Sequence, residues 1–173
     1  INQLITLTRM SEPEELVLSK VNFSEITEES ADSFKSVLAK DNKKYVVSID
    51  PNLYINAEQR SLLELVNILI DNAQKYCDPE GEVMVILAKS RLNQNVVLTV
   101  TNSYKNGAGI DTNRFFERFY REDESHHYDG KQKNGFGIGL SMAQDLVSTF
   151  GGKINASWSD GVMNFTVTFK RVH

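Results

Sequence analysis

Cysteine is nearly absent from this sequence, which has only Cys77 among its 173 residues. An internal disulfide framework and a zinc site made of cysteines alone are therefore excluded, and a single thiol fits a reducing compartment. Long apolar runs are missing as well. None approaches the roughly 18 residues that a membrane-spanning helix needs, and no signal-peptide pattern is visible. Basic residues are scattered and the net charge is −4, so the sequence gives no support for a nucleic-acid-binding surface.

The composition of the sequence is typical of a globular protein. Hydrophobic residues make up 40% of the sequence and charged residues 24%, which allows a buried core and a solvated surface. A length of 173 residues fits one domain with a short appendage. The chain begins at Ile1 rather than at methionine, and we expect it to be part of a longer protein.

Hydrophobic spacing predicts a mixture of helices and strands. Helices are expected over residues 1–10, 24–39, 58–76 and 113–120, and from residue 139 to the glycines at 151 and 152. Strands are expected at 21–23, 44–49, 53–56, 82–90, 95–102, 153–159 and 163–170. Hairpins and helices are mixed without regular alternation, which favours an α+β fold or an open α/β sandwich. The polar residues 121–134 are expected to form a long loop.

The segment GFGIGL, residues 135–140, places three glycines at the start of a predicted helix. Unpaired backbone N–H groups and the positive end of the helix dipole suit a phosphate there. A plain turn explains the glycines equally well. The segment does not fit the dinucleotide motif, because Leu140 stands where that motif has its last glycine.

The predicted helix over 58–76 carries a second candidate group. Asn72, Lys75 and Tyr76 have the spacing of one helix face. An amide oxygen suits a magnesium ion that is also bound by phosphates and water, a lysine suits a phosphate, and a tyrosine ring suits a base. An ordinary amphipathic helix with a paired asparagine remains the alternative.

Three segments in this order, LIDNAQKY, FFERFYREDESH and GFGIGLSMAQDLVSTFGGKI, resemble the catalytic ATP-binding domain of bacterial two-component sensor histidine kinases. That family belongs to the GHKL group with gyrase, the Hsp90 chaperone and the MutL repair protein. The resemblance covers residues from about 45 to 169. It implies a two-layer α/β sandwich, the Bergerat fold, in which a mixed sheet packs against about three helices. It also implies that residues 1–20 end a dimerisation helix and its linker, and that residues 21–173 form the catalytic domain.

The resemblance assigns roles to individual residues. Asn72 would coordinate magnesium, Lys75 would contact phosphate and Tyr76 would contact the base. Phe116 and Phe119 would anchor a lid, and Arg121 would reach the terminal phosphates. The glycine segment would lie against the phosphates with Gly135, Phe136, Gly137, Ile138, Gly139 and Leu140. The groups expected to act in catalysis are Asn72, Lys75 and Arg121.

The sequence departs from the family pattern at three positions. The family has an aspartate that accepts a hydrogen bond from the adenine amino group, and its spacing from Phe116 places Asn102 there. An asparagine oxygen can accept the same bond, and Gly107 and Gly109 then become incidental loop glycines. Ile68 stands where related ATPases carry a water-activating glutamate, and His126 stands where arginine is frequent.

The function that the resemblance implies is histidine phosphorylation. The chain would bind Mg²⁺ and ATP and donate the γ-phosphoryl group to a histidine on a missing dimerisation domain, for relay to a response regulator. The full protein would be a homodimeric, membrane-anchored sensor with this domain in the cytoplasm. His126 and His127 are interpreted as solvated loop residues. The accepting histidine of the family lies on a helix and is followed by an acidic residue, and because no such segment is found here, we expect the chain to lack its own phosphoacceptor. A degenerate nucleotide-binding regulatory module and an anti-sigma-type serine kinase remain alternatives.

Overall fold

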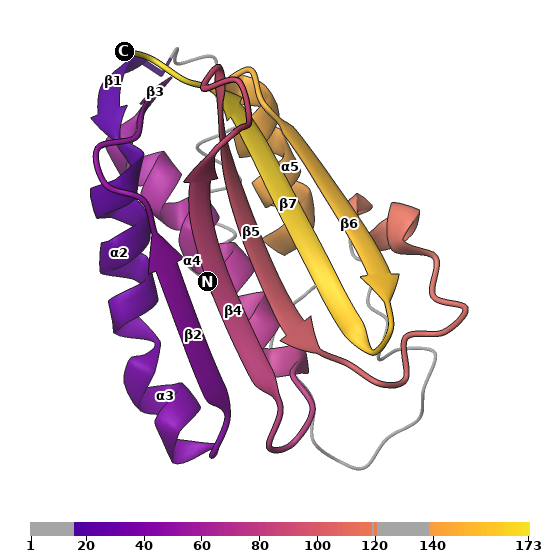
Figure 1. The fold of residues 1–173 in the computed structure, drawn as a ribbon. Helices are drawn as coiled ribbons and strands as arrows, with labels where there is room; N and C mark the ends of the chain where they lie inside the picture. Colours follow the sequence, from indigo (N-terminus) through magenta and orange to yellow (C-terminus); the bar gives the residue numbers. More distant parts are fainter. Residues whose placement is uncertain (1–15, 119, 121–138) are drawn as a thin grey trace.

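A computed structural model of the chain describes residues 16–118, 120 and 139–173. These residues form two layers, with a mixed five-stranded sheet on one side and helices covering one of its faces (Figure 1). The strands lie in the order β2 (Lys44–Ile49), β4 (Glu82–Lys89), β5 (Asn95–Ser103), β7 (Val162–Lys170) and β6 (Lys153–Ser159). Only the β2–β4 pair is parallel. The predicted α+β sandwich is confirmed.

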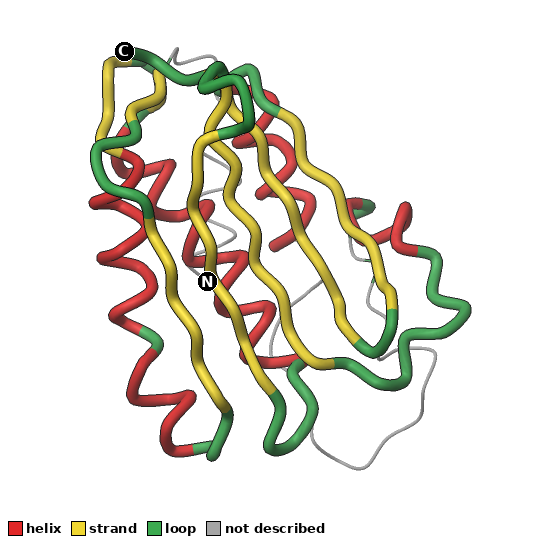
Figure 2. The backbone as a smooth tube through the Cα atoms, in the orientation of Figure 1, coloured by secondary structure: helices red, strands yellow, loops and turns green. Residues whose placement is uncertain are grey.

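The helical layer contains α2 (Phe23–Ser33), α4 (Gln59–Tyr76) and α5 (Gly139–Thr149), with the short α3 (Lys35–Lys40) following α2. In Figure 2, α4 and α5 lie behind the strands, and α2 and α3 are seen beside β2. A separate two-stranded sheet pairs β1 (Ser19–Asn22) with β3 (Tyr54–Ala57). None of the helices formed by the described residues combines the length and the apolar character of a membrane-spanning segment.

The core lies between the sheet and the helices, and strict alternation along the strands creates it. Every second residue of the two central strands faces the helices and is buried: Val96, Leu98, Val100 and Asn102 on β5, and Met163, Phe165, Val167 and Phe169 on β7. Asn102 is the only polar residue in these two rows. It therefore occupies a core position at the end of an apolar strand.

Helix α4 contributes the largest apolar face to this core. Its buried residues are Leu62, Leu65, Val66, Ile68, Leu69, Ile70 and Ala73. The Glu58 carboxylate accepts hydrogen bonds from the backbone N–H groups of Arg60 and Ser61, which caps the helix. The predicted helix over 58–76 is thus confirmed to within one residue.

The single helix predicted over residues 24–39 is wrong, because the chain is interrupted at Phe34. The Phe34 N–H donates to Ala31 O at 3.2 Å, a tight turn that ends α2. The Tyr45 hydroxyl also donates to Ala31 O, at 2.8 Å. A tertiary hydrogen bond from β2 therefore occupies the carbonyl at the break. The helix predicted at 113–120 is a 3₁₀ helix, η1 (Thr112–Phe116), within the described residues.

Gly107 lies in the loop after β5, as predicted, and a packing contact explains why this position is a glycine. A Cβ atom at this position would lie 2.1 Å from Trp158 Nε1, so only glycine fits beneath the indole ring. The Trp158 N–H donates to Tyr104 O at 2.6 Å. Together these contacts hold the loop that follows β5 against β6. Gly109 has a positive φ of 84° with open space around it, which glycine adopts without strain.

Candidate functional site

The last turns of α4 carry Asn72, Lys75 and Tyr76, all of them half-buried. Lys75 Nζ lies 2.8 Å from Asp71 Oδ2, and the two side chains are 30% and 34% exposed. The other oxygen of Asp71 accepts a hydrogen bond from Gln74 Nε2 at 3.1 Å. Asp71 thus holds the ammonium group along the helix surface. Sequence reasoning missed it, although its i,i+4 spacing to Lys75 is a recognisable signal.

Asn102 ends the apolar row of β5, between Val83 on β4 and Met163 on β7. The residue is 1% exposed. Its Nδ2 donates to Ser103 O at 3.2 Å, whereas its Oδ1 is buried and has no hydrogen-bond partner among the described residues. A buried acceptor without a hydrogen bond lowers the stability of the folded state, and such acceptors are rare in folded proteins. The site therefore offers an acceptor to a ligand that carries an N–H group.

The turn between α4 and β4 closes the site beside Asn102. The Asp78 N–H donates to Ser103 O at 2.9 Å, which fastens this turn to the end of β5. A Cβ atom on Gly81 would lie 2.8 Å from Ser103 Cβ and 2.9 Å from Cys77 Sγ, so the packing is tight. Cys77 is buried, and this burial raises the pKa of its thiol. Its chemistry is therefore that of a core residue rather than a nucleophile.

Aromatic residues anchor the chain that follows η1. Phe116, a predicted site residue, is half-buried and meets the Phe165 ring edge-on at 6.3 Å. Its neighbour Phe115 stacks on the same ring at 6.2 Å. Arg118 lies 3.9 Å from Asp145 on α5. These contacts attach the segment leading to residue 120 to both β7 and α5.

Some of the predicted site residues lie in the part of the chain that the structure describes, and the others lie outside it. The structure places Asn72, Lys75 and Tyr76 on α4 and Asn102 on β5, and α4 packs directly against β5. Gly139 is the first residue of α5, and Leu140 packs against the core. Ile68 is 6% exposed and lies in the core, where it offers no group that could activate water. Phe116 is described above, and the remaining six lie outside the described residues: Phe119, Arg121, Gly135, Phe136, Gly137 and Ile138.

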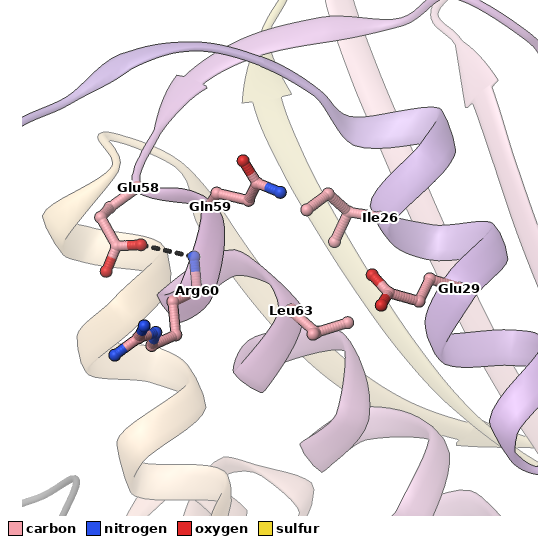
Figure 3. A pocket seen from close by; sticks show the side chains of 6 residues that line it. All are labelled: Ile26, Glu29, Glu58, Gln59, Arg60 and Leu63. Atoms are coloured by element: carbon pink, nitrogen blue, oxygen red, sulfur yellow. Dashed lines mark hydrogen bonds between the residues drawn. The ribbon is translucent and has the colours of Figure 1, made fainter.

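A separate cavity of about 560 Å³ lies between α2 and the start of α4 (Figure 3). It is lined by Ile26, Glu29, Glu58, Gln59, Arg60 and Leu63. Asn72 is 13 residues beyond Gln59 on α4, which corresponds to about 20 Å along the helix. None of the predicted site residues that the structure describes lines this cavity. The candidate site is therefore defined by its polar side chains on α4 and β5, and not by the cavity between α2 and α4.

The chain is similar in sequence to a sensor protein and to a signal transduction histidine kinase. The chain is 32% identical over 125 residues to the sensor protein CiaH of Streptococcus pneumoniae, covering 70% of this chain and 26% of CiaH. It is 31% identical over 175 residues to the signal transduction histidine-protein kinase ArlS of Staphylococcus haemolyticus, covering 98% of this chain and 36% of ArlS. The chain thus spans about a third or less of these two relatives.

The fold is shared with a mycobacterial sensor histidine kinase, MprB, whose solved structure matches with a TM-score of 0.73 at 21% identity. That match covers 90% of this chain and 98% of the other. A family model described as the histidine kinase-, DNA gyrase B- and HSP90-like ATPase matches residues 57–173. This range contains α4, β5 and α5 and therefore the whole candidate site. The chain belongs to the histidine kinase-, DNA gyrase B- and HSP90-like ATPase family.

Proposed function

We propose that the chain is the catalytic domain of a two-component sensor histidine kinase and transfers the γ-phosphoryl group of Mg-ATP to a histidine of a dimerisation domain. The observation that carries this proposal is the buried Oδ1 of Asn102, which has no hydrogen-bond partner in the part of the chain that the structure describes. It lies at the end of β5, against which the helix bearing Asn72, Lys75 and Tyr76 packs. A buried acceptor on β5 and a cation on the adjoining helix match the two ends of a nucleotide.

Each described residue has one task in this proposal. Asn102 Oδ1 accepts a hydrogen bond from the adenine amino group, and Tyr76 contacts the base. The Asn72 amide oxygen would hold Mg²⁺, which would offset the negative charge of the phosphates. Lys75 turns from Asp71 to the phosphates. Arg121, Phe119 and the glycine segment are expected to close over the phosphates, as in the family.

Bound Mg-ATP supplies the phosphoryl group, whose bond to the leaving ADP oxygen breaks as an imidazole nitrogen bonds to phosphorus. The protein contributes positioning and charge, which dominate catalysis in phosphoryl transfer. Ile68 is apolar and buried, so no base stands at this position to deprotonate water. The phosphoryl group is therefore directed to an acceptor side chain rather than lost to hydrolysis.

The roles proposed for the rest of the protein are taken from the histidine kinase family. Residues 1–20 would join a dimerisation domain to the catalytic domain at 21–173. That domain would supply the phosphoacceptor histidine and the homodimer, and a response regulator would receive the phosphoryl group. Anchoring of the sensor in a membrane, with this domain in the cytoplasm, would come from segments outside this chain.

Isothermal titration calorimetry of the purified chain with ATP and a non-hydrolysable analogue, with and without Mg²⁺, tests nucleotide binding. We expect binding that requires magnesium and discriminates against GTP. Asn72→Ala should lose the magnesium-dependent part of the affinity, whereas Gln74→Ala on the same helix should retain it. Failure of the wild-type chain to bind ATP would refute the proposal.

Phosphotransfer tests the reaction itself. The chain is mixed with ATP carrying a labelled γ-phosphate and with a separately produced dimerisation domain of a sensor kinase. Acid-labile phosphate on the histidine of that domain is the expected product. ATP binding without any transfer would favour the degenerate regulatory module, and acid-stable phosphoserine would favour the serine kinase.

A further inference from the structure

The side-chain amide of Asn102 can adopt two orientations that differ in hydrogen bonding, whereas the two oxygens of an aspartate are equivalent. The two ends of a side-chain amide have nearly the same shape, but the oxygen accepts hydrogen bonds and the nitrogen donates them. Turning the amide by half a rotation would convert the acceptor at the site into a donor. The neighbours of Asn102 therefore decide which ligand group it can bind.

One neighbour fixes the amide in the acceptor orientation. Asn102 Nδ2 donates to Ser103 O at 3.2 Å, and Oδ1 is left without a partner among the described residues. In the turned orientation Oδ1 would face Ser103 O, which places two acceptors against each other. The position of the Ser103 carbonyl therefore determines what Asn102 presents.

Asp78 contacts both that carbonyl and the chain two residues beyond it. Its backbone N–H donates to Ser103 O at 2.9 Å, so this oxygen accepts from both Asp78 and Asn102. Its carboxylate Oδ2 accepts from the backbone N–H of Lys105 at 2.8 Å. The chain on both sides of Tyr104 is thus tied to the turn after α4. Asp78 O also accepts from the Gly81 N–H at 2.9 Å, which closes the turn itself.

We propose that Asp78 is a positioning residue that makes the site select purine nucleotides with an amino group at position 6 over those with an oxo group. This inference rests on the proposed function, in which Asn102 faces the purine. Asp78 acts through Ser103 and Asn102 and does not touch the nucleotide. Without the Asp78 carboxylate, Lys105 N–H is released. The Asp78 N–H still donates to Ser103 O, but from a turn that is no longer fastened to the chain at Lys105. The Asn102 amide can then turn and donate to a 6-oxo group.

ATP and inosine triphosphate form a suitable ligand pair, because they differ in the group at position 6 and the proton on the adjoining ring nitrogen. Their dissociation constants are measured by calorimetry for the wild type, Asp78→Ala, Asp78→Asn and Asp32→Ala. The wild type should prefer ATP by about tenfold, the value of one well-made buried hydrogen bond. Asp78→Ala should lose most of this preference, with inosine triphosphate binding at least as well as before.

Two variants serve as controls. Asp78→Asn retains a side-chain oxygen for the Lys105 N–H and should keep the preference for ATP. Asp32→Ala removes an aspartate charge from α2, where Asp32 is 58% exposed and pairs with Lys35 at 3.0 Å. It should also keep the preference, which separates positioning from a general effect of charge.

The outcomes are distinct. A lower ATP preference in Asp78→Ala alone supports the inference, and equal weakening of both nucleotides with an unchanged ratio overturns it. If Asp78→Ala does not fold by circular dichroism, Asp78→Ser decides in the same way, because serine favours turns but its hydroxyl is too short to replace the carboxylate. Failure of the wild type to bind either nucleotide overturns the proposed function together with the inference. Binding of both by the wild type without preference overturns the inference alone.

Discussion

Lys75 Nζ and Asp71 Oδ2 lie 2.8 Å apart on successive turns of α4, and both side chains are about one-third exposed. The lysine that is proposed to bind phosphate is thus held by a carboxylate of its own helix. A phosphate must compete with Asp71 for this ammonium group. The pair lowers the net positive charge of the site when no nucleotide is bound.

Asp71→Asn should therefore increase the affinity for ATP. The substitution keeps the side-chain shape and removes the competing charge. Because the pair is partly exposed, the gain should be modest, about two- to fivefold at low ionic strength, and it should shrink as salt is added. Calorimetric titrations at two salt concentrations measure both effects. A weaker affinity in Asp71→Asn would show that the carboxylate supports nucleotide binding instead.

Asn102→Leu should weaken ATP binding and stabilise the fold at the same time. The leucine removes a buried acceptor that has no partner among the described residues and continues the apolar row of β5. We expect the affinity to fall by about tenfold and the free energy of unfolding to rise by about 1 kcal/mol. Urea denaturation without nucleotide measures the stability. A loss of both stability and binding would mean that the asparagine is a structural residue.

Gly107→Ala should destabilise the protein through Trp158. The new methyl group would overlap the indole ring, where a Cβ atom would lie 2.1 Å from Nε1. Overpacking of this kind costs about 1–3 kcal/mol. Trp158 is the sole tryptophan of the chain, so its fluorescence should shift in the folded variant.

Gly109→Ala is the matched control for this effect. Its strain comes from a positive φ of 84° in open space, and it should cost about 1 kcal/mol without a change in the emission of Trp158. An unchanged emission in Gly107→Ala would contradict the packing of the loop under the ring.

Tyr45 should make stability depend on pH in the alkaline range. Burial, together with the negative charge of Asp32, raises the pKa of Tyr45 from 10.0 to about 12. Between these values the unfolded chain loses the phenolic proton while the folded chain keeps it. Stability from this group is therefore complete below pH 10 and is lost as the pH rises towards 12. Urea denaturation across this range should show a smaller decline for Tyr45→Phe than for the wild type, and parallel declines would exclude this role for Tyr45.

Local patterns in the sequence predict most of this fold. Alternation along β5 and β7 and the apolar face of α4 each require only the residues of one element, and they are confirmed. The spacing that the family shows before Phe116 pointed to Asn102, and the role of this residue in binding stays a prediction. The break at Phe34 was missed because the bond from Tyr45 to Ala31 O joins two elements. The tie between Asp78 and Ser103 was missed for the same reason, since 25 residues separate them.

The burial of Cys77 makes this chain suitable for a simple chemical assay. The chain has one thiol, and it is enclosed by the turn that Asp78 and Gly81 form beside the candidate site. An alkylating reagent can reach it only when that turn opens. The rate of Cys77 alkylation therefore measures how often the turn beside Asn102 opens. A ligand bound at the candidate site should lower this rate.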